Sequence, residues 1–195
     1  KSSLVKDLEA FYRMIEDSNI VFVNQPKPKG FGHAVLMAKP FIGSSPFLVC
    51  AGDTYVISKD KSFLKRMCET FSQDVAATLL LQEVQDPRRY GVAVAKRRGG
   101  EFDVLRVVEK PDVPPSKMAI MPFYLFKPEI IDVLEGLEPG VGGEIQLTDA
   151  IQKLIERGRR VVGVMLEDDE IRLDIGTPET YWEAVKASYE YFRGG

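Results

Sequence analysis

The stretch Pro46-Phe47-Leu48-Val49-Cys50-Ala51-Gly52-Asp53 decides the fold class. A short apolar run between a proline and a glycine is typical of a buried strand. Helical patterns flank it at residues 33–39 and 60–71. Strands that alternate with helices predict an α/β sheet that is mostly parallel, with right-handed crossovers. Because ligands bind beyond the carboxyl ends of such strands, Asp53 is the first candidate for a functional residue.

The rest of the chain extends this alternation into a single expected domain over residues 1–195. Apolar periodicity predicts further helices over 3–17, 128–135, 145–157 and from 178 onward. Strand-like runs cover residues 20–23, 77–84, 90–96, 104–109, 118–126, 161–166 and 171–175. Because Gly99-Gly100 supplies a hairpin turn, part of the sheet is expected to be antiparallel and the whole sheet mixed.

The composition excludes several classes of protein. With 195 residues, 45% of them hydrophobic and 28% charged, the chain is neither a disordered tail nor a disulfide knot. The net charge is −3 and the charges are interspersed apart from short clusters such as Lys96-Arg97-Arg98, which gives no support for binding to nucleic acid or to a membrane. The two cysteines lack metal-like spacing, and we expect Cys50 to be a small buried hydrophobe in a reducing, cytoplasmic compartment.

Two acids at strand ends are candidates for a metal site. Asp53 ends the first apolar strand, and Asp174 lies between Leu173 and Ile175 in the last one. On neighbouring strands they would form a two-carboxylate Mg²⁺ site with coordination positions left open for phosphates. More than a hundred residues separate them, so spacing alone does not establish the pair. Each also has a structural interpretation, Asp53 as a turn cap and Asp174 as a partner of the helix start behind it.

Polar residues near other strand and helix ends extend this set. Lys110 could neutralise phosphate charge and Glu109 could accept hydrogen bonds from sugar hydroxyls, or the two could form a surface ion pair. The amide of Gln25 can donate to and accept from a nucleobase edge, or it is ordinary loop polarity. Glu144 near a helix start suits the helix dipole in either case. His33 is the single histidine, which excludes a multi-histidine metal site. At an expected helix start it is interpreted as structural or substrate-neighbouring rather than as the general base of a Ser-His-Asp triad.

Six segments of the chain together resemble the sugar-1-phosphate nucleotidyltransferases, most closely the bacterial and archaeal UTP–glucose-1-phosphate uridylyltransferase branch. They are residues 25–36 (QPKPKGFGHAVL), 52–53 (GD), 90–92 (YGV), 108–111 (VEKP), 142–151 (GGEIQLTDAI) and 173–178 (LDIGTP). Each segment is weak evidence alone, but together they occur in the family's order across nearly the whole chain. The resemblance implies a Rossmann-like, three-layer nucleotidyltransferase fold with a mixed, mostly parallel sheet.

The resemblance also implies how the nucleotide and metal would be held. Gln25 would bind the uracil through its amide, and Gly30 would do so through close backbone approach. Asp53 would bind Mg²⁺ and act in catalysis, with Asp174 as the second metal ligand.

On the sugar side, Gly91 and Glu109 would contact the glucosyl hydroxyls, with Glu144 as a weaker candidate. Lys110 would bind the phosphate of glucose 1-phosphate and share the catalytic role. The implied reaction is in-line attack of glucose 1-phosphate on the α-phosphorus of UTP, which gives UDP-glucose and pyrophosphate. Positioning and charge neutralisation would supply the catalysis, without a covalent intermediate.

One departure from the family pattern changes the expectation for the isolated chain. The family's first strand and its Gly-x-Gly-x-Arg loop, which cradles the triphosphate, have no counterpart in this sequence. We therefore expect an N-terminally truncated domain that lacks the first strand, from an active parent protein, and an inactive fragment.

Several alternatives remain open. The chain could be a non-catalytic module that binds or senses nucleotide sugars, or a thymidylyl- or guanylyltransferase of the same fold. A GT-A glycosyltransferase is disfavoured because residues 53–55 do not form Asp-x-Asp. Aromatic residues in the last helix favour either a packing surface within the chain or a subunit surface, the latter in a dimer or tetramer.

Overall fold

The computed structural model describes residues 2–193. Its α-helices are α1 (Ser2–Glu16), α2 (Phe31–Met37), α3 (Ser62–Thr70), α4 (Glu129–Glu135), α5 (Leu147–Glu156) and α6 (Pro178–Arg193). Its strands are β1 (Phe47–Cys50), β2 (Thr54–Ile57), β3 (Val75–Glu83), β4 (Gly91–Arg98), β5 (Glu101–Glu109), β6 (Met118–Phe126), β7 (Arg160–Met165) and β8 (Ile171–Asp174). Apart from β2, each strand was expected from the sequence.

The main sheet has six strands in the order β1-β6-β3-β7-β5-β4. It is mixed, as expected, but the expected parallel majority is wrong. Among residues 2–193, β3–β7 is the one parallel pair of neighbours in this sheet, and the others pair antiparallel. The helical crossovers do return β1, β3 and β7 in one direction. However, β6 pairs between β1 and β3, and β5 pairs along β7, each in the opposite direction.

Helices cover both faces of the sheet at its central strand, β3. Leu79 and Leu81 belong to the core cluster that includes buried residues of α4 and α5. Leu80, which points to the other face, packs in a second cluster with Phe63 and Met67 of α3. Because both faces are covered, β3 is fully buried from its first residue through Leu81. The three-layer arrangement expected from the sequence is confirmed.

A second, two-stranded ladder stands beside the main sheet. β2 and β8 pair antiparallel, with Thr54 opposite Asp174 at one end and Ile57 opposite Ile171 at the other. Helix α6 packs against this ladder through Ala184. The ladder matters for the site because β2 directly follows Asp53, and β8 carries Asp174.

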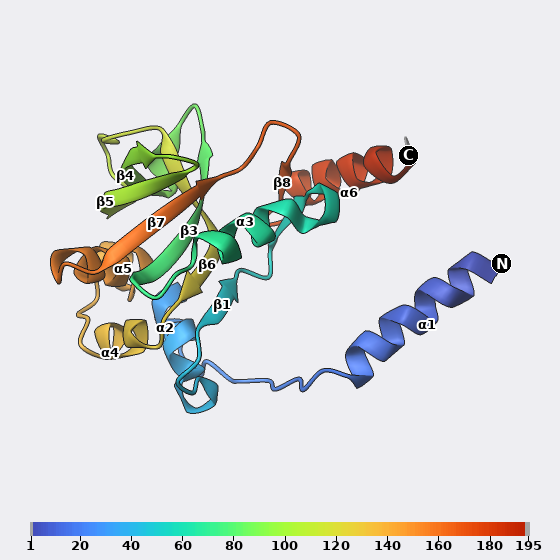
Figure 1. The fold of residues 1–195 in the computed structure, drawn as a ribbon, viewed down its shortest axis with the longest axis horizontal. Helices are drawn as coiled ribbons and strands as arrows, with labels where there is room; N and C mark the ends of the chain where they lie inside the picture. The colour runs from blue at the N-terminus through green and yellow to red at the C-terminus, as the bar shows by residue number, and fades with distance from the viewer. Residues whose placement is uncertain (1, 194–195) are drawn as a thin grey trace.

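The N-terminal segment lies apart from the sheet (Figure 1). Helix α1 confirms the helix expected over residues 3–17, but the strand expected over 20–23 is wrong. Those residues form no strand, and Phe22 is 95% exposed. An apolar run needs a pairing strand to satisfy its backbone groups, and among the described residues it has none.

Two further observations concern exposure and length. Cys50 is exposed, so the expected burial is wrong; β1 lies at the sheet edge, where its residues alternate between half-buried and exposed. No helix within residues 2–193 combines the length and apolar character needed to cross a membrane.

Candidate functional site

A cavity of about 360 Å³ opens where β4 and β5 meet the β2–β8 ladder. Its lining includes six of the residues singled out in the sequence, which are Asp53, Gly91, Glu109, Lys110, Glu144 and Asp174. A larger cavity of about 680 Å³ lies between α6 and the ladder, but aromatic and aliphatic side chains dominate its lining. The smaller cavity is therefore the candidate site, because charged groups converge there.

The β2–β8 ladder brings the two candidate metal ligands together. Asp174 lies opposite Thr54, the neighbour of Asp53, and the Ile175 N–H donates to the Asp53 carbonyl oxygen at 2.9 Å. The Asp174 Oδ1 accepts a hydrogen bond from the Gly176 N–H at 3.0 Å, so the structural role considered for this residue is present for one oxygen. The Asp53 carboxylate is exposed, and its one side-chain contact, from the Thr54 hydroxyl, is long at 3.5 Å.

This donor set fits a hard divalent cation. Two carboxylates that line the same cavity could supply oxygen ligands, which Mg²⁺ prefers, and would leave other coordination positions for phosphate and water. In the part of the chain that the structure describes, no cluster of three or more His, Cys, Asp or Glu residues could hold a metal ion. If a metal binds at this cavity, Asp53 and Asp174 are the two sequence candidates at its edge that would hold it.

Glu109 ends β5 at the cavity, and Lys110 follows it. The Glu109 side chain is 10% exposed, whereas that of Lys110 is half-exposed, and its Nζ lies 3.7 Å from the Glu109 Oε1. The backbone N–H of Lys110 donates to the Tyr90 carbonyl at 3.0 Å, and its φ of 38° is in the left-handed region. A non-glycine residue there carries a strain of roughly 1 kcal/mol or more, a feature that clusters at functional sites. The ion pair weighed from the sequence exists, and it lies within the cavity.

Tyr124 also lines the cavity beside Glu109. Burial, and secondarily the negative charge of Glu109, raise the pKa of the Tyr124 phenol. Its hydroxyl therefore remains protonated across the physiological pH range and is available as a hydrogen-bond donor.

Gly91 leaves room in the cavity that no other residue would leave. A Cβ at this position would lie 2.7 Å from the Thr148 Oγ1 and 3.2 Å from the Glu109 Oε2. The missing side chain therefore keeps the space beside the Glu109 carboxylate open to a ligand.

Gln25 and Gly30 lie together in one loop, but neither lines the cavity. The Gln25 Nε2 donates to the Gly30 carbonyl at 3.1 Å and lies 2.9 Å from the Nδ1 of His33. Gly30 has a φ of 98°, and a Cβ on it would lie 2.7 Å from the Cβ of Glu144. The loop thus packs directly against Glu144, which does line the cavity.

Other lining residues were not among the sequence candidates. They include Arg89, Tyr90, Gln146, Thr148 and Arg172. Arg172 had a usable signal, since it precedes Asp174 by two residues in a strand and so shares its face. Tyr90, Gln146 and Thr148 lie within two of the segments that carry the family resemblance, so those segments were a usable signal for them. Arg89 reaches the cavity through tertiary packing, which local spacing does not encode.

Comparisons with known proteins give a consistent result. The family model described as nucleotidyl transferase matches residues 4–190. A UTP–glucose-1-phosphate uridylyltransferase of Pseudomonas aeruginosa is 36% identical over 191 residues, which are 95% of this chain and 67% of that protein. The enzyme of the same name from Staphylococcus epidermidis is 37% identical over 179 residues, 89% of this chain and 60% of that protein.

A solved structure agrees with these relatives. The crystal structure of a UDP-glucose pyrophosphorylase complexed with UDP-glucose superposes with a TM-score of 0.86 and is 32% identical, covering 94% of this chain and 71% of the other. The chain thus spans between about three fifths and seven tenths of the proteins it matches.

Proposed function

Because this chain belongs to the nucleotidyl transferase family, we propose that it forms the substrate-binding part of an enzyme. That enzyme transfers a uridylyl group from UTP to glucose 1-phosphate. One observation carries the proposal. A single cavity joins a two-carboxylate metal position, Asp53 and Asp174, to a carboxylate and an amine at a strand end, Glu109 and Lys110. The names of the similar proteins support the choice of substrates.

In this proposal Asp53 and Asp174 hold Mg²⁺, which when bound neutralises charge on the phosphates. The pairing of β2 with β8 fixes both acids at one edge of the cavity. Asp53 is exposed and has few hydrogen bonds within the protein, which suits a ligand to an exchangeable ion.

Glucose 1-phosphate is held from the other side of the cavity. Lys110 binds its phosphate, and Glu109 accepts hydrogen bonds from glucosyl hydroxyls in the space that Gly91 leaves open. Glu144 lies at the same cavity and contributes to the sugar side. The Lys110 side chain is half-exposed and its Nζ lies 3.7 Å from the Glu109 Oε1, beyond hydrogen-bond distance, so its ammonium group can donate to an incoming phosphate.

The chemistry requires positioning rather than a protein nucleophile. A phosphate oxygen of glucose 1-phosphate attacks the α-phosphorus of UTP, a new P–O bond forms, and the bond to the β-phosphate breaks to release pyrophosphate. Lys110 offsets negative charge on the attacking group, and the protein contributes orientation. The loop that contains Gln25 and Gly30 adjoins the cavity through Glu144 and would bind the uracil. Since UTP is a nucleotide of the cell interior, we assign the reaction to the cytoplasm.

Release of pyrophosphate tests the proposal. It is measured with UTP, glucose 1-phosphate and Mg²⁺, for the 195-residue chain and for any longer product of its reading frame, with binding of UDP-glucose followed by calorimetry. We expect UTP-dependent release by the longer product, which Lys110→Ala abolishes and which Lys39→Ala, a change at an exposed lysine paired with Glu135 of α4, leaves intact. Equal release with dTTP or GTP would contradict the assignment of UTP. Tight binding of UDP-glucose without pyrophosphate release, by both the 195-residue chain and the longer protein, would favour a non-catalytic binding module.

A further inference from the structure

Arg172 is a half-buried arginine whose partners are neutral. Its Nε donates to the Gln82 Oε1 at 3.0 Å, and its Nη2 donates to the Tyr90 Oη at 3.1 Å. Its guanidinium carbon lies 5.5 Å from the centroid of the Tyr90 ring. Among residues 2–193, no carboxylate oxygen comes within ion-pair distance of it, and its Nη1 makes no hydrogen bond. The side chain is held in place, while its charge is not offset.

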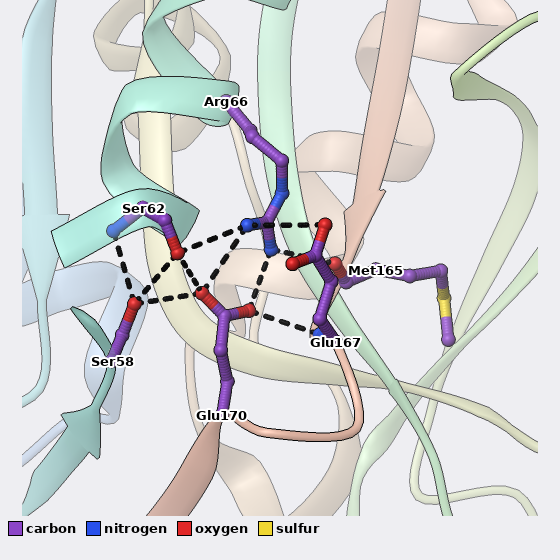
Figure 2. A network of polar contacts seen from close by, with 6 residues as sticks. All are labelled: Ser58, Ser62, Arg66, Met165, Glu167 and Glu170. Carbon is purple, nitrogen blue, oxygen red and sulfur yellow. Dashed lines mark hydrogen bonds and ion pairs between the residues drawn. The ribbon is translucent and has the colours of Figure 1, made fainter. Parts of the chain in front are cut away.

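The other half-buried arginines in this molecule are neutralised by the protein. Arg66, whose side chain is 25% exposed, lies 2.6 Å from the Glu170 Oε2 and 3.5 Å from the Glu167 Oε1. Figure 2 shows that these contacts enclose the Arg66 guanidinium. Arg160, 26% exposed, forms ion pairs with three acids, Asp74, Glu101 and Asp103.

This difference has a physical meaning. A guanidinium that is partly removed from water normally gains a carboxylate or phosphate partner, because neutral acceptors satisfy its hydrogen bonds but not its charge. Its planar fork also matches a phosphate in a bidentate geometry. Arg172 therefore has the features of an anion-binding side chain that is positioned before its ligand arrives.

The location of Arg172 identifies the ligand class. It lines the candidate site together with Asp53, Lys110 and Asp174. It also lines an adjoining polar cavity of about 460 Å³, which it shares with Arg89. Because Arg172 and Asp174 are alternate residues of β8, they occupy the same face of the strand. The cation thus lies next to the proposed metal position, where phosphate groups would converge.

We propose that Arg172 is a substrate-binding residue that holds a phosphate group in this cavity, in addition to the one assigned to Lys110. The inference rests on the proposed function for the identity of the phosphate compound. Its chemical class is a phosphate monoester or diphosphate, and two sources share that chemistry. These are the pyrophosphate portion of the nucleotide and the phosphate of the sugar.

Calorimetric titration of the 195-residue chain with pyrophosphate and, separately, with glucose 1-phosphate tests this role. Arg172→Gln is expected to weaken binding of one of the two by about tenfold or more, the effect of losing charge-assisted hydrogen bonds. Arg172→Lys keeps the charge but lacks the planar fork, so its affinity for that probe is expected to lie between those of the wild type and Arg172→Gln. Arg97→Gln is the matched control, since it removes one positive charge from an exposed position at the β4–β5 hairpin and should leave both affinities within about twofold.

Thermal unfolding by circular dichroism accompanies each titration. If Arg172→Gln unfolds, the Arg172→Lys variant decides the question, because an ammonium group can still donate to Gln82 or Tyr90. The probe that binds more weakly to the variant, pyrophosphate or glucose 1-phosphate, identifies the source of the phosphate. Wild-type affinity of a folded Arg172 variant for both probes would overturn the inference, and so would a wild-type chain that binds neither.

The outcome is separable from that of the proposed function. Pyrophosphate binding that needs Arg172, without UTP-dependent turnover by the longer product, would retain the inference and reject the uridylyltransferase. Turnover with an unchanged KM for each substrate in Arg172→Gln would retain the enzyme and reject the inference.

Discussion

The two ends of the β2–β8 ladder treat charged side chains in opposite ways. At the end where Ile57 pairs with Ile171, the Glu170 carboxylate is nearly inaccessible and accepts five hydrogen bonds (Figure 2). At the end where Thr54 pairs with Asp174, the carboxylates lie at a cavity and accept few hydrogen bonds from the protein. The same short ladder therefore has a closed end and an open end.

The closed end is held by donors from three directions. Ser58 after β2 and Ser62 on α3 donate their hydroxyls to Glu170 at 2.8 and 2.7 Å, and Arg66 and the Glu167 N–H complete the set. Burial alone would raise the pKa of Glu170, but these hydrogen bonds outweigh it and lower the pKa to about 2. The comparison teaches that a charge matched by protein donors contributes stability, whereas an unmatched charge remains available to a ligand.

Loss of the Glu170 carboxylate at the closed end should have the largest effect, and that effect is on the stability of the fold. Glu170→Ala leaves the Arg66 guanidinium without its main partner and is expected to lower the free energy of unfolding by about 3–5 kcal/mol. Urea unfolding followed by circular dichroism measures it. Glu135→Ala breaks the exposed pair with Lys39, whose side chains are 45% and 49% exposed, and should cost less than about 1 kcal/mol. Equal costs for the two variants would remove the distinction between a matched and a solvated charge.

At the open end the effect should fall on activity. In the longer product of the reading frame, Asp53→Ala is expected to reduce Mg²⁺-dependent pyrophosphate release by at least about 100-fold, which corresponds to about 3 kcal/mol of lost charge stabilisation. The fold should persist because the Asp53 side chain is exposed and makes one long hydrogen bond. Release is measured over a Mg²⁺ series, with a melting curve as the control for folding. Near-normal turnover of the variant would contradict the role of Asp53 as a metal ligand.

The low pKa of Glu170 predicts that the stability contributed by the closed end depends on pH. Its pKa is about 2 in the folded protein and 4.5 in the reference state, so its stabilisation is fully present above about pH 5 and is lost as the pH falls toward 2. Between pH 5 and pH 3 the difference in unfolding free energy between wild type and Glu170→Gln should shrink by about 2 kcal/mol. Urea unfolding at the two pH values checks this, and a constant difference would contradict the assigned pKa.

The smallest expected effect concerns the space in the cavity. Gly91→Ala places a Cβ within 2.7 Å of the Thr148 Oγ1 and 3.2 Å of the Glu109 Oε2. We expect the KM for glucose 1-phosphate to rise about tenfold and the KM for UTP to change little, because the crowding is on the sugar side. Gly100→Ala is the control, since a Cβ there meets nothing within 4 Å. A larger change in the KM for UTP would place the sugar elsewhere.

Local patterns predicted most of the elements but not their pairing. Apolar periodicity located the helices and seven of the eight strands, because burial on one face or both leaves a signal within a few residues. It missed β2, which has only four residues, two of them buried. It also assigned the sheet a parallel majority, because the insertion of β6 between β1 and β3 depends on contacts far apart in sequence.

For the candidate site too, local patterns identified individual residues but not how they are brought together. Asp53 and Asp174 were found as acids at strand ends, but their adjacency depends on the β2–β8 register, which spacing cannot supply. Gln25 and Gly30 were grouped correctly in one loop, yet that loop adjoins the cavity and does not line it. Arg172 was overlooked because an arginine in a strand is ordinary until its partners are known to be neutral.

The separation of the ladder's strands along the chain also bears on the order in which the molecule folds. Ile57 and Ile171 are 114 residues apart, and closing a loop of that length costs on the order of 4 kcal/mol of chain entropy. Local hairpins such as β4–β5 have no such delay, so the ladder should be among the last structures to form and the first to open. Opening it would separate both acids of the site in one event. Amide protons of β2 and β8 should therefore exchange with solvent together, well ahead of those in β3.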